Sequence, residues 1–337
     1  MSKVRIGING FGRIGRNTLK IAFEHRDVCE IVGINDLTDT KTLAHLLKHD
    51  STYGQYRYDV SHDETSITVD GVKIQVFAEK DPSMLKWGEL NTHVVVESTG
   101  RFLDRETAGA HVKAGAKRVV ISAPSKGNDP APTHVLGVNP YDGGSDIINN
   151  ASCTTNSVAA LMMVLDREFG IEKAMLSTIH SYTQSQMLLD GPSKDLREAR
   201  AAALNIVPTA TGAAIAVAQS LPQLKGIFDG LSFRVPTPTV SISDVTAVLK
   251  RDVTVEEINA ALTKASMEPE LEGILGVTTE ELVSMDFKGD SHSCVVDTKL
   301  TRVVGGNLIK VAAWYDNEWG YSNRLVEQVI MVGQTAL

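Results

Sequence analysis

Cysteine is scarce in this chain of 337 residues, with only Cys29, Cys153 and Cys294. Three thiols so far apart in sequence indicate neither a disulfide framework nor a zinc site, a pattern typical of a reducing cytosol. Long apolar runs are also missing, since none approaches the roughly 18 residues of a transmembrane helix. We therefore expect a cytoplasmic protein with no membrane span and no metal site.

The chain has no excess of positive charge. Its 33 lysines and arginines stand against 41 aspartates and glutamates, a formal net charge of −8. This balance disfavours a surface built for nucleic acid or anionic membranes, so we do not expect nucleic acid as the primary partner. The residues Met1–Val4 lead directly into an expected strand, which leaves no room for a signal or transit peptide.

The two halves of the chain differ in their patterns. The first alternates expected strands (4–9, 29–35, 93–98, 118–122) with expected helices (13–24, 105–114), and Asp70-Gly71 predicts a hairpin within 63–77. The second half predicts helices over 153–168, 211–220, 255–267 and 323–331, and strands over 173–180, 230–235 and 239–250. Residues 181–205 show no period and are interpreted as a site or interface loop. We expect an α/β domain with a doubly wound, mostly parallel sheet, followed by an α+β domain with a largely antiparallel sheet.

The segment Gly10-Phe11-Gly12-Arg13-Ile14-Gly15 has the form G-x-G-x-x-G, after an expected strand and at the start of an expected helix. Glycines there allow a tight turn and close approach of the backbone to a pyrophosphate, whose charge the helix N-terminus stabilises. Asp36 follows the second strand, where its carboxylate can bind the adenine ribose and repel a 2′-phosphate. The pattern predicts an NAD site, against the alternative of a plain glycine turn with a loop aspartate.

Cys153 stands at the start of an expected helix, and His180 ends the next apolar run. Because only the thiolate attacks carbonyls, and a helix N-terminus and an imidazole both lower the pKa of a thiol, the pair indicates a nucleophilic cysteine with its base. A buried structural thiol and a core histidine are the alternatives. Together with the dinucleotide pattern, the pair suggests that an aldehyde is oxidised through a thioester.

Four segments (Ile8–Arg16, Ser152–Asn156, Phe233–Pro236 and Trp314–Glu318) resemble the glyceraldehyde-3-phosphate dehydrogenase family, and the likeness runs from residue 3 to about residue 330. The resemblance implies a Rossmann-type NAD-binding domain over 1–152, a catalytic domain over 153–317, and a final segment, about 318–337, that packs back on the first domain. It also implies a homotetramer and the phosphorylating oxidation of D-glyceraldehyde 3-phosphate to 1,3-bisphosphoglycerate, through a hemithioacetal and a thioester on Cys153, with His180 as base.

The resemblance also implies roles for further residues. On the NAD side these are Gly10, Gly12, Arg13, Ile14, Asp36, Lys80, Ser122 and Asn317. The substrate's phosphate is expected at Thr183 and Arg234, and inorganic phosphate at Ser152, Thr154, Thr211 and Gly212. Some relatives carry arginine where this chain has Glu198, so Arg200 is the expected additional phosphate ligand.

Three other functions fit parts of this pattern. Erythrose-4-phosphate dehydrogenase shares the thioester scaffold but passes the acyl group to water, and Thr209–Ala214 favours the phosphorylating reaction because it offers hydroxyl and backbone donors to a second anion. A non-phosphorylating aldehyde dehydrogenase would not need two such sites. A dinucleotide-binding sensor or moonlighting protein would not need the Cys153–His180 pair.

Overall fold

The computed structural model describes residues 2–337 and divides them into two compact units. The first comprises residues up to 134, 141–151 and 322–337, and the second comprises 135–140 and 152–321. Within residues 2–337, the structure contains no helix with the length and apolar character needed to cross a membrane.

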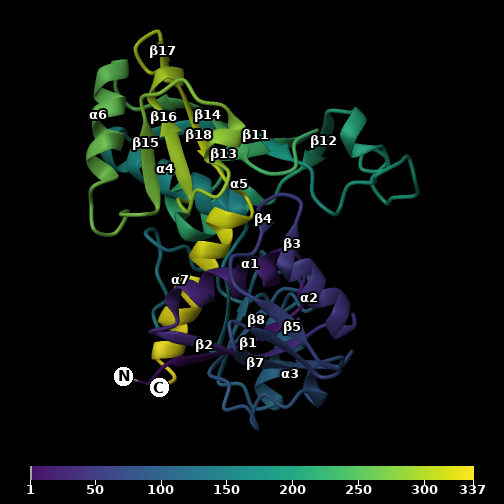
Figure 1. Cartoon of the computed structure of the whole chain (residues 1–337). Coiled ribbons are helices and arrows are strands. Elements are labelled where there is room, and N and C mark those ends of the chain that lie inside the picture. The colour runs from purple at the N-terminus through teal and green to yellow at the C-terminus, as the bar shows by residue number, and fades with distance from the viewer. Residues whose placement is uncertain (1) are drawn as a thin grey trace. The chain divides into compact units, whose positions relative to one another are not determined.

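The first unit is built on an eight-stranded sheet in the order β10-β9-β8-β1-β2-β7-β6-β5 (Figure 1). Its strands are β1 (Val4–Asn9), β2 (Cys29–Asn35), β5 (Val60–His62), β6 (Ser66–Val69), β7 (Val72–Phe77), β8 (Val94–Glu97), β9 (Arg118–Ile121) and β10 (Ile147–Asn149). The strands from β10 to β7 pair in parallel, and β5, β6 and β7 pair antiparallel. The central strand β8 is buried along its whole length, as expected for a parallel strand covered on both faces.

The helices of the first unit are α1 (Arg13–Ala22), α2 (Thr40–Lys48), α3 (Arg105–Lys113) and most of α7 (Trp319–Gln334), and β3 (His49–Asp50) pairs with β4 (Gly54–Gln55). The end of α7 lies directly on the sheet. A Cβ atom added to Gly333 would lie 2.1 Å from Cγ1 of Val4 and 3.1 Å from Cγ2 of Val94. Only glycine allows α7 to approach β1 and β8 this closely.

The second unit contains a seven-stranded sheet in the order β12-β13-β11-β14-β18-β16-β15, with β17 paired to β18. Its strands are β11 (Ile171–Ser181), β12 (Val207–Ala210), β13 (Phe228–Val235), β14 (Ser241–Leu249), β15 (Leu275–Thr278), β16 (Cys294–Asp297), β17 (Arg302–Val304) and β18 (Leu308–Tyr315). Most neighbours are antiparallel, whereas β11–β13 and β15–β16 are parallel. Buried and half-buried residues alternate along β14, the period expected of a strand with one face in the core.

Three helices belong to the second unit: α4 (Cys153–Phe169), α5 (Ala213–Ser220) and α6 (Val255–Ala265). Helix α4 contacts strands β11, β14, β16 and β18 and both other helices, so it is the core helix of the unit. Helix α6 begins with the expected capping box, because Thr254 accepts from the Glu257 amide and Glu257 accepts from the Thr254 amide. Short 3₁₀ segments are η1 (Phe23–His25), η2 (Pro82–Met84), η3 (Ala202–Leu204), η4 (Pro222–Leu224), η5 (Ser284–Phe287) and η6 (Thr298–Leu300).

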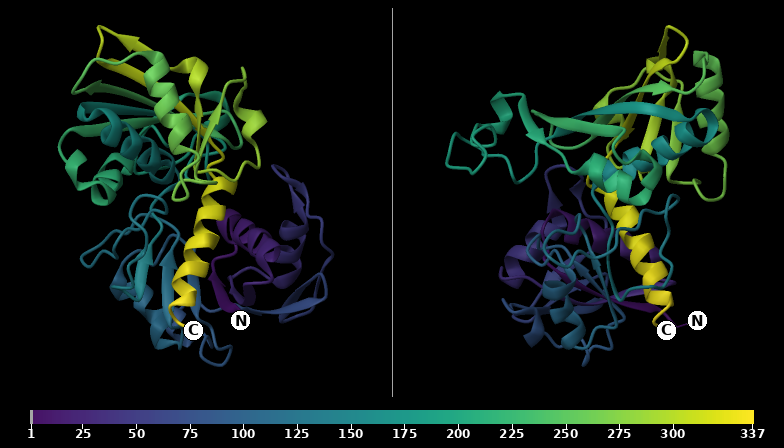
Figure 2. Two further views of the ribbon diagram at one scale, coloured as in Figure 1. Left: turned by 90° about the vertical axis from the view of Figure 1, so that its left-hand side faces the viewer. Right: turned by 180° about the vertical axis from the view of Figure 1, so that it is seen from behind.

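The segment between β11 and β12 is mostly irregular, as the absence of a period in 181–205 predicts. Figure 1 and the right-hand view of Figure 2 show this segment, in teal, extending away from the sheet of the second unit. Its leucines lie largely in solvent: Leu188 is 84% exposed and Leu196 is 82% exposed.

Candidate active site

Cys153 is the first residue of α4, and the preceding residues fix where the helix begins. Ser152 is the N-cap, and its hydroxyl accepts a hydrogen bond from the Thr155 amide at 3.1 Å. Ala151 has φ of +54°, a left-handed conformation that is costly for alanine and turns the chain sharply into the helix. The half-buried thiol is thereby held at the positive end of the α4 dipole.

His180, near the end of β11, faces this thiol. Its Nε2 lies 3.4 Å from the Cys153 Sγ, and its Nδ1 lies 2.7 Å from the Ser181 carbonyl oxygen. The Arg234 guanidinium also makes a short contact with Nδ1, although arginine can only donate. Nδ1 cannot both donate to Ser181 and accept from Arg234. We assign the proton to Nδ1, because Arg234 has the Ser181 oxygen as another acceptor at 3.3 Å. This tautomer presents the Nε2 lone pair to the sulfur.

The pKa of Cys153 is shifted upward, and the expectation of a lowered pKa is wrong for this structure. Burial raises it, and the opposing effects of the Arg234 charge and of hydrogen bonds from Thr154 are smaller. Burial, followed by the Arg234 charge, lowers the pKa of His180 to about 3. Both shifts favour a neutral thiol beside a neutral imidazole.

Tyr315, the last residue of β18, is a member of this cluster to which the sequence analysis gave no role. Its hydroxyl is 2.8 Å from the Thr154 hydroxyl, and its ring packs edge-on against His180 with centroids 6.1 Å apart. Burial raises the pKa of Tyr315, so the hydroxyl stays protonated. The only signal in the sequence was the Trp314–Glu318 motif, because the pattern analysis did not identify β18 as a strand.

The expected anion ligands are only partly brought together. Arg234 contacts His180. Its Nε is a buried donor with no partner in the described part of the chain, so it can donate to an anion. The Thr154 hydroxyl instead contacts Tyr315. Among residues 2–337, exposed Arg200 pairs with Asp190 at 2.8 Å and does not touch Cys153, His180 or Arg234.

Three further expected ligands, Thr183, Thr211 and Gly212, lie in loops of the second unit. The Thr183 amide and hydroxyl contact the Gln186 side chain at 2.9 and 3.2 Å. Gly212 is the N-cap of α5 without a side-chain cap, and Thr211 accepts from the Ala213 amide at 3.1 Å. A helix N-terminus capped in this way keeps amide donors available for an anion.

Asn317 belongs to the second unit and is held by two hydroxyls. Its amide oxygen accepts hydrogen bonds from Ser181 at 2.8 Å and from Ser241 at 3.1 Å. Because the oxygen is engaged, the side chain is oriented so that its NH₂ group is the donor for a ligand.

The glycine motif of the first unit fits a dinucleotide. Gly10 has φ of +91°, and a Cβ on Gly15 would lie 2.2 Å from the Gly10 carbonyl oxygen. A Cβ on Gly12 would meet no atom within 4 Å, so the backbone there is open to a ligand. Gly12 caps α1 without any side-chain hydrogen bond, and no acidic residue stands in the first turn. An open, positive helix end of this kind is suited to a pyrophosphate.

The other residues expected on the NAD side differ in what they contact. Asp36, just after β2, accepts from the Phe11 amide at 2.8 Å and from the Thr38 amide at 3.0 Å, which fixes its carboxylate beside the glycine turn. Arg13 forms an ion pair with Asp50 at 2.8 Å. Ile14 is half-buried in α1, exposed Lys80 follows β7, and half-buried Ser122 follows β9.

A doubly wound unit with a dinucleotide cradle and a second unit with a cysteine–histidine pair define an NAD-dependent oxidoreductase that acts on an aldehyde. Comparisons with known proteins identify the family. Residues 4–105 match the model described as glyceraldehyde 3-phosphate dehydrogenase, NAD binding domain, and residues 152–317 match that of the C-terminal domain of the same enzyme. The chain therefore belongs to the glyceraldehyde-3-phosphate dehydrogenase family.

Three relatives named glyceraldehyde-3-phosphate dehydrogenase illustrate the similarity. The chain is 52% identical to the protein of Streptomyces coelicolor over 333 residues, which cover 98% of both chains. It is 52% identical to that of Geobacillus stearothermophilus over 337 residues, 99% of each. A chloroplastic relative from Arabidopsis thaliana is 52% identical over 330 residues, 97% of this chain and 83% of the relative.

Proposed function

We propose that this chain oxidises D-glyceraldehyde 3-phosphate to 1,3-bisphosphoglycerate, with reduction of NAD and uptake of inorganic phosphate. The observation that carries the proposal is the 3.4 Å contact between the Cys153 sulfur and a His180 nitrogen whose lone pair faces it. A thiol in contact with a neutral imidazole at a helix N-terminus is the arrangement that forms a thioester from an aldehyde.

In the first step the Cys153 sulfur attacks the aldehyde carbon, and the thiol proton passes through His180 to the carbonyl oxygen, giving a hemithioacetal. NAD, when bound, supplies the acceptor for the hydride that leaves this carbon. His180 removes the hydroxyl proton in the same step, and a thioester on Cys153 remains. An oxygen of inorganic phosphate then attacks the thioester carbon, the C–S bond breaks, and the Cys153 thiolate is released. The amide of Cys153 and His180 stabilise the oxyanion in both additions.

NAD is assigned to the glycine cradle of the first unit. Gly10, Gly12, Arg13 and Ile14 serve the pyrophosphate, Asp36 the adenine ribose, and Lys80 and Ser122 the adenine side. Asn317 serves the nicotinamide carboxamide, supported by the orientation of its NH₂ group. The division into an NAD-binding domain over 1–152 and a catalytic domain over 153–317, with 318–337 returning to the first, is part of the same proposal.

Two anion sites are needed, and they differ in their support. Arg234 and Thr183 hold the substrate's phosphate, and the unpartnered Nε of Arg234 supports this role. Ser152, Thr154, Thr211 and Gly212 hold inorganic phosphate, supported by the open N-terminus of α5. The Thr154 hydroxyl can still donate to phosphate when it accepts from Tyr315, and Arg200 engages Asp190 through Nε, so its terminal nitrogens can still donate.

We further propose a homotetramer in the cytoplasm. Exposed apolar side chains on and around the β11–β12 segment are the support, because a monomer would leave them in water. They are Leu188, Leu189, Leu196, Leu204, Ile206 and Ile215, each at least 68% exposed. An open groove of about 860 Å³, lined in part by Met175, Ile215, Phe228 and Leu308, offers a second apolar surface to another copy. Sedimentation at micromolar concentration tests the assembly, and a monomer would contradict it.

The test of the reaction is NADH formation from glyceraldehyde 3-phosphate with and without inorganic phosphate or arsenate. We expect turnover that requires the anion, and loss of turnover without loss of NAD binding in Cys153→Ala. Turnover with erythrose 4-phosphate that is independent of phosphate would instead assign the hydrolytic reaction. Oxidation retained in Cys153→Ala would contradict the thioester route.

A further inference from the structure

A buried carboxylate in the first unit has no role in the reaction described above. Glu97 ends β8, is 1% exposed, and pairs in register with Asn9 at the end of β1. The chain continues from β1 to β2 and from β8 to β9, which lie in opposite directions along the sheet. Dinucleotides bind outside the carboxyl ends of the strands at such a switch point.

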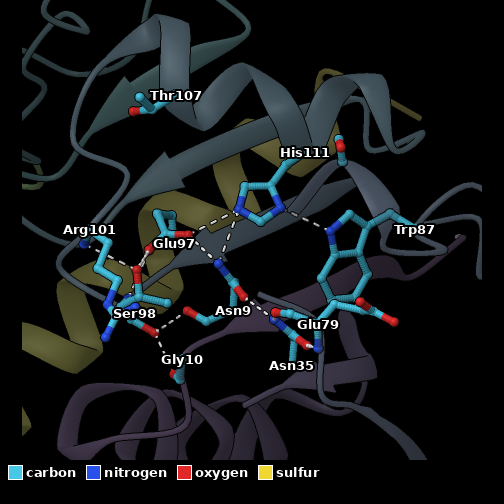
Figure 3. A network of polar contacts seen from close by, with 12 residues as sticks. Asn9, Gly10, Asn35, Glu79, Trp87, Glu97, Ser98, Arg101, Thr107 and His111 are labelled. Carbon is cyan, nitrogen blue, oxygen red and sulfur yellow. Dashed lines mark hydrogen bonds and ion pairs between the residues drawn. The ribbon is translucent and has the colours of Figure 1, made fainter. Parts of the chain in front are cut away.

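Four hydrogen-bond donors converge on the Glu97 carboxylate. Oε1 accepts from the Thr99 amide at 2.8 Å and from the Thr99 hydroxyl. Oε2 accepts from Asn9 Nδ2 at 2.5 Å and from His111 Nε2 at 3.0 Å (Figure 3). Each of these four groups can donate, so both carboxylate oxygens are satisfied by hydrogen bonds from side chains and backbone of the same unit.

The state of His111 is fixed by Trp87. The Trp87 Nε1, which can only donate, lies 3.0 Å from His111 Nδ1. Nδ1 must therefore accept, and the single proton of the neutral ring stands on Nε2, which points at Glu97 (Figure 3). Trp87 and His111 are both completely buried, so water cannot replace either partner.

The residues that follow Glu97 lie directly on the glycine turn. The Ser98 hydroxyl donates to the Gly10 carbonyl oxygen at 2.7 Å. A Cβ on Gly10 would stand 2.8 Å from the Ser98 carbonyl carbon and from the Thr99 nitrogen. The Thr99 amide and hydroxyl, which hold the Ser98–Gly100 turn in place, both donate to the Glu97 carboxylate.

We propose that Glu97 is a positioning residue for NAD. Its carboxylate, oriented by His111 and Trp87, locks the Ser98–Gly100 turn against the Gly10 turn, so that the backbone of the pyrophosphate cradle is preformed before the dinucleotide arrives. Preformed sites bind more tightly because no ordering cost remains at binding. The proposal rests on NAD binding by the first unit, which is measured first in the unaltered protein.

Glu97→Gln tests the proposal with almost no change of shape. A glutamine has one acceptor oxygen and one NH₂ donor. If the NH₂ group takes the Oε2 position, it faces the donors of Asn9 and His111; if it takes the Oε1 position, the Thr99 hydroxyl can turn and accept from it, but the Thr99 amide still faces a donor. We expect the Kd and the KM for NAD to rise about 10- to 100-fold, because a buried donor is left without an acceptor. The kcat at saturating NAD and the KM for the aldehyde should stay within about twofold.

A second variant distinguishes positioning from general damage. In Glu97→Gln/Trp87→Phe the ring of His111 is free to move its proton to Nδ1 and accept from the glutamine NH₂. The fold-increase in the Kd for NAD of the double variant should therefore be well below the product of the fold-increases of Glu97→Gln and Trp87→Phe. Thr301→Val is the matched control: it removes a 2.7 Å hydrogen bond from buried Thr301 to Asn259 in the second unit, and should lower Tm without changing the Kd for NAD.

The outcomes separate the possibilities. An unaltered protein that fails to bind NAD would contradict the proposed function itself. NAD binding by Glu97→Gln equal to that of the unaltered protein would overturn the positioning role, as would losses in kcat equal to those in kcat/KM. If Trp87→Phe does not fold, nitrogen NMR of histidine-labelled unaltered protein at neutral pH still decides the matter, since a protonated Nδ1 on His111 would overturn the arrangement.

Discussion

Removal of the Arg234 charge should make Cys153 harder to ionise. Arg234 is the cation that acts on both members of the pair: after burial, it has the largest effect on the pKa of Cys153, which it lowers, and it also lowers the pKa of His180. A neighbouring opposite charge shifts a pKa by about one to three units. We expect Arg234→Gln to raise the midpoint of Cys153 ionisation by about one to two units.

The assay is the rate of Cys153 alkylation by iodoacetamide against pH, in protein free of NAD and substrate. Only the thiolate reacts, so below its pKa the rate falls tenfold for each unit by which the pKa rises. Arg234→Gln should therefore react about 10- to 100-fold more slowly at neutral pH and regain the original rate at higher pH. In the unaltered protein the pKa of His180, about 3, leaves the ring neutral throughout this range. Burial, the larger cause of that lowered pKa, remains in Arg234→Gln.

Arg167→Gln is the control for the loss of an arginine from the same unit. Arg167 pairs with Glu268 and lies 14 residues along α4 from Cys153, about 21 Å at the rise of a helix. Its alkylation profile should match that of the unaltered protein. An unchanged profile in Arg234→Gln, or equal shifts in both variants, would refute the argument that this guanidinium controls the thiol.

Three further changes test other parts of the structure. Asp36→Gly should raise kcat/KM for NADP relative to NAD, because the carboxylate that repels a 2′-phosphate is gone, and unchanged NADP kinetics would count against its role. Asp50→Asn should lower the free energy of unfolding in urea by about 3–5 kcal/mol, since it leaves the buried Lys20 ammonium unpaired, and adding Lys20→Met should recover part of the loss. Burial opposes the ionisation of Asp50, but Arg13 and the Thr52 and Tyr53 amides together outweigh it and lower the pKa of Asp50 to about 2. The stability that the Asp50 charge contributes is therefore present above about pH 4 and is lost as the pH falls toward 2, and Asp50→Asn should show no such pH dependence. His180→Asn should reduce kcat about 10²- to 10⁴-fold with NAD binding intact, and a smaller loss would indicate another base.

Local patterns predicted the elements whose burial follows a simple period. The strands β1 and β2 and the start of α4 lie where the sequence places them. The hairpin around Asp70-Gly71 is also confirmed, with Asp70 at φ of +48° and Gly71 at φ of +78°. A turn of this kind needs two residues that tolerate positive φ, and that requirement is visible in the sequence itself.

The elements that were missed depend on partners distant in sequence. Helix α2 and strands β15 to β18 were not identified, and β15 and β17 are short strands at the margin of their sheet. Tyr315 entered the cysteine cluster only because β18 pairs with β14 and brings it beside Thr154. The predicted direction of the Cys153 pKa shift was wrong for a related reason. Neighbours in sequence indicate a helix N-terminus, whereas the burial that raises the pKa is set by the whole unit.

The course of α7 has a consequence for biosynthesis. Residues 322–337 belong to the first unit, yet the ribosome makes them after the whole second unit, and Gly333 covers the two central strands that hold Val4 and Val94. Until that stretch emerges, a nascent chain carries a half-covered parallel sheet open to chaperones and to neighbouring polypeptides. A ribosome stalled near residue 320 should thus display a protease-sensitive dinucleotide domain, which becomes resistant once the final turns of helix are released.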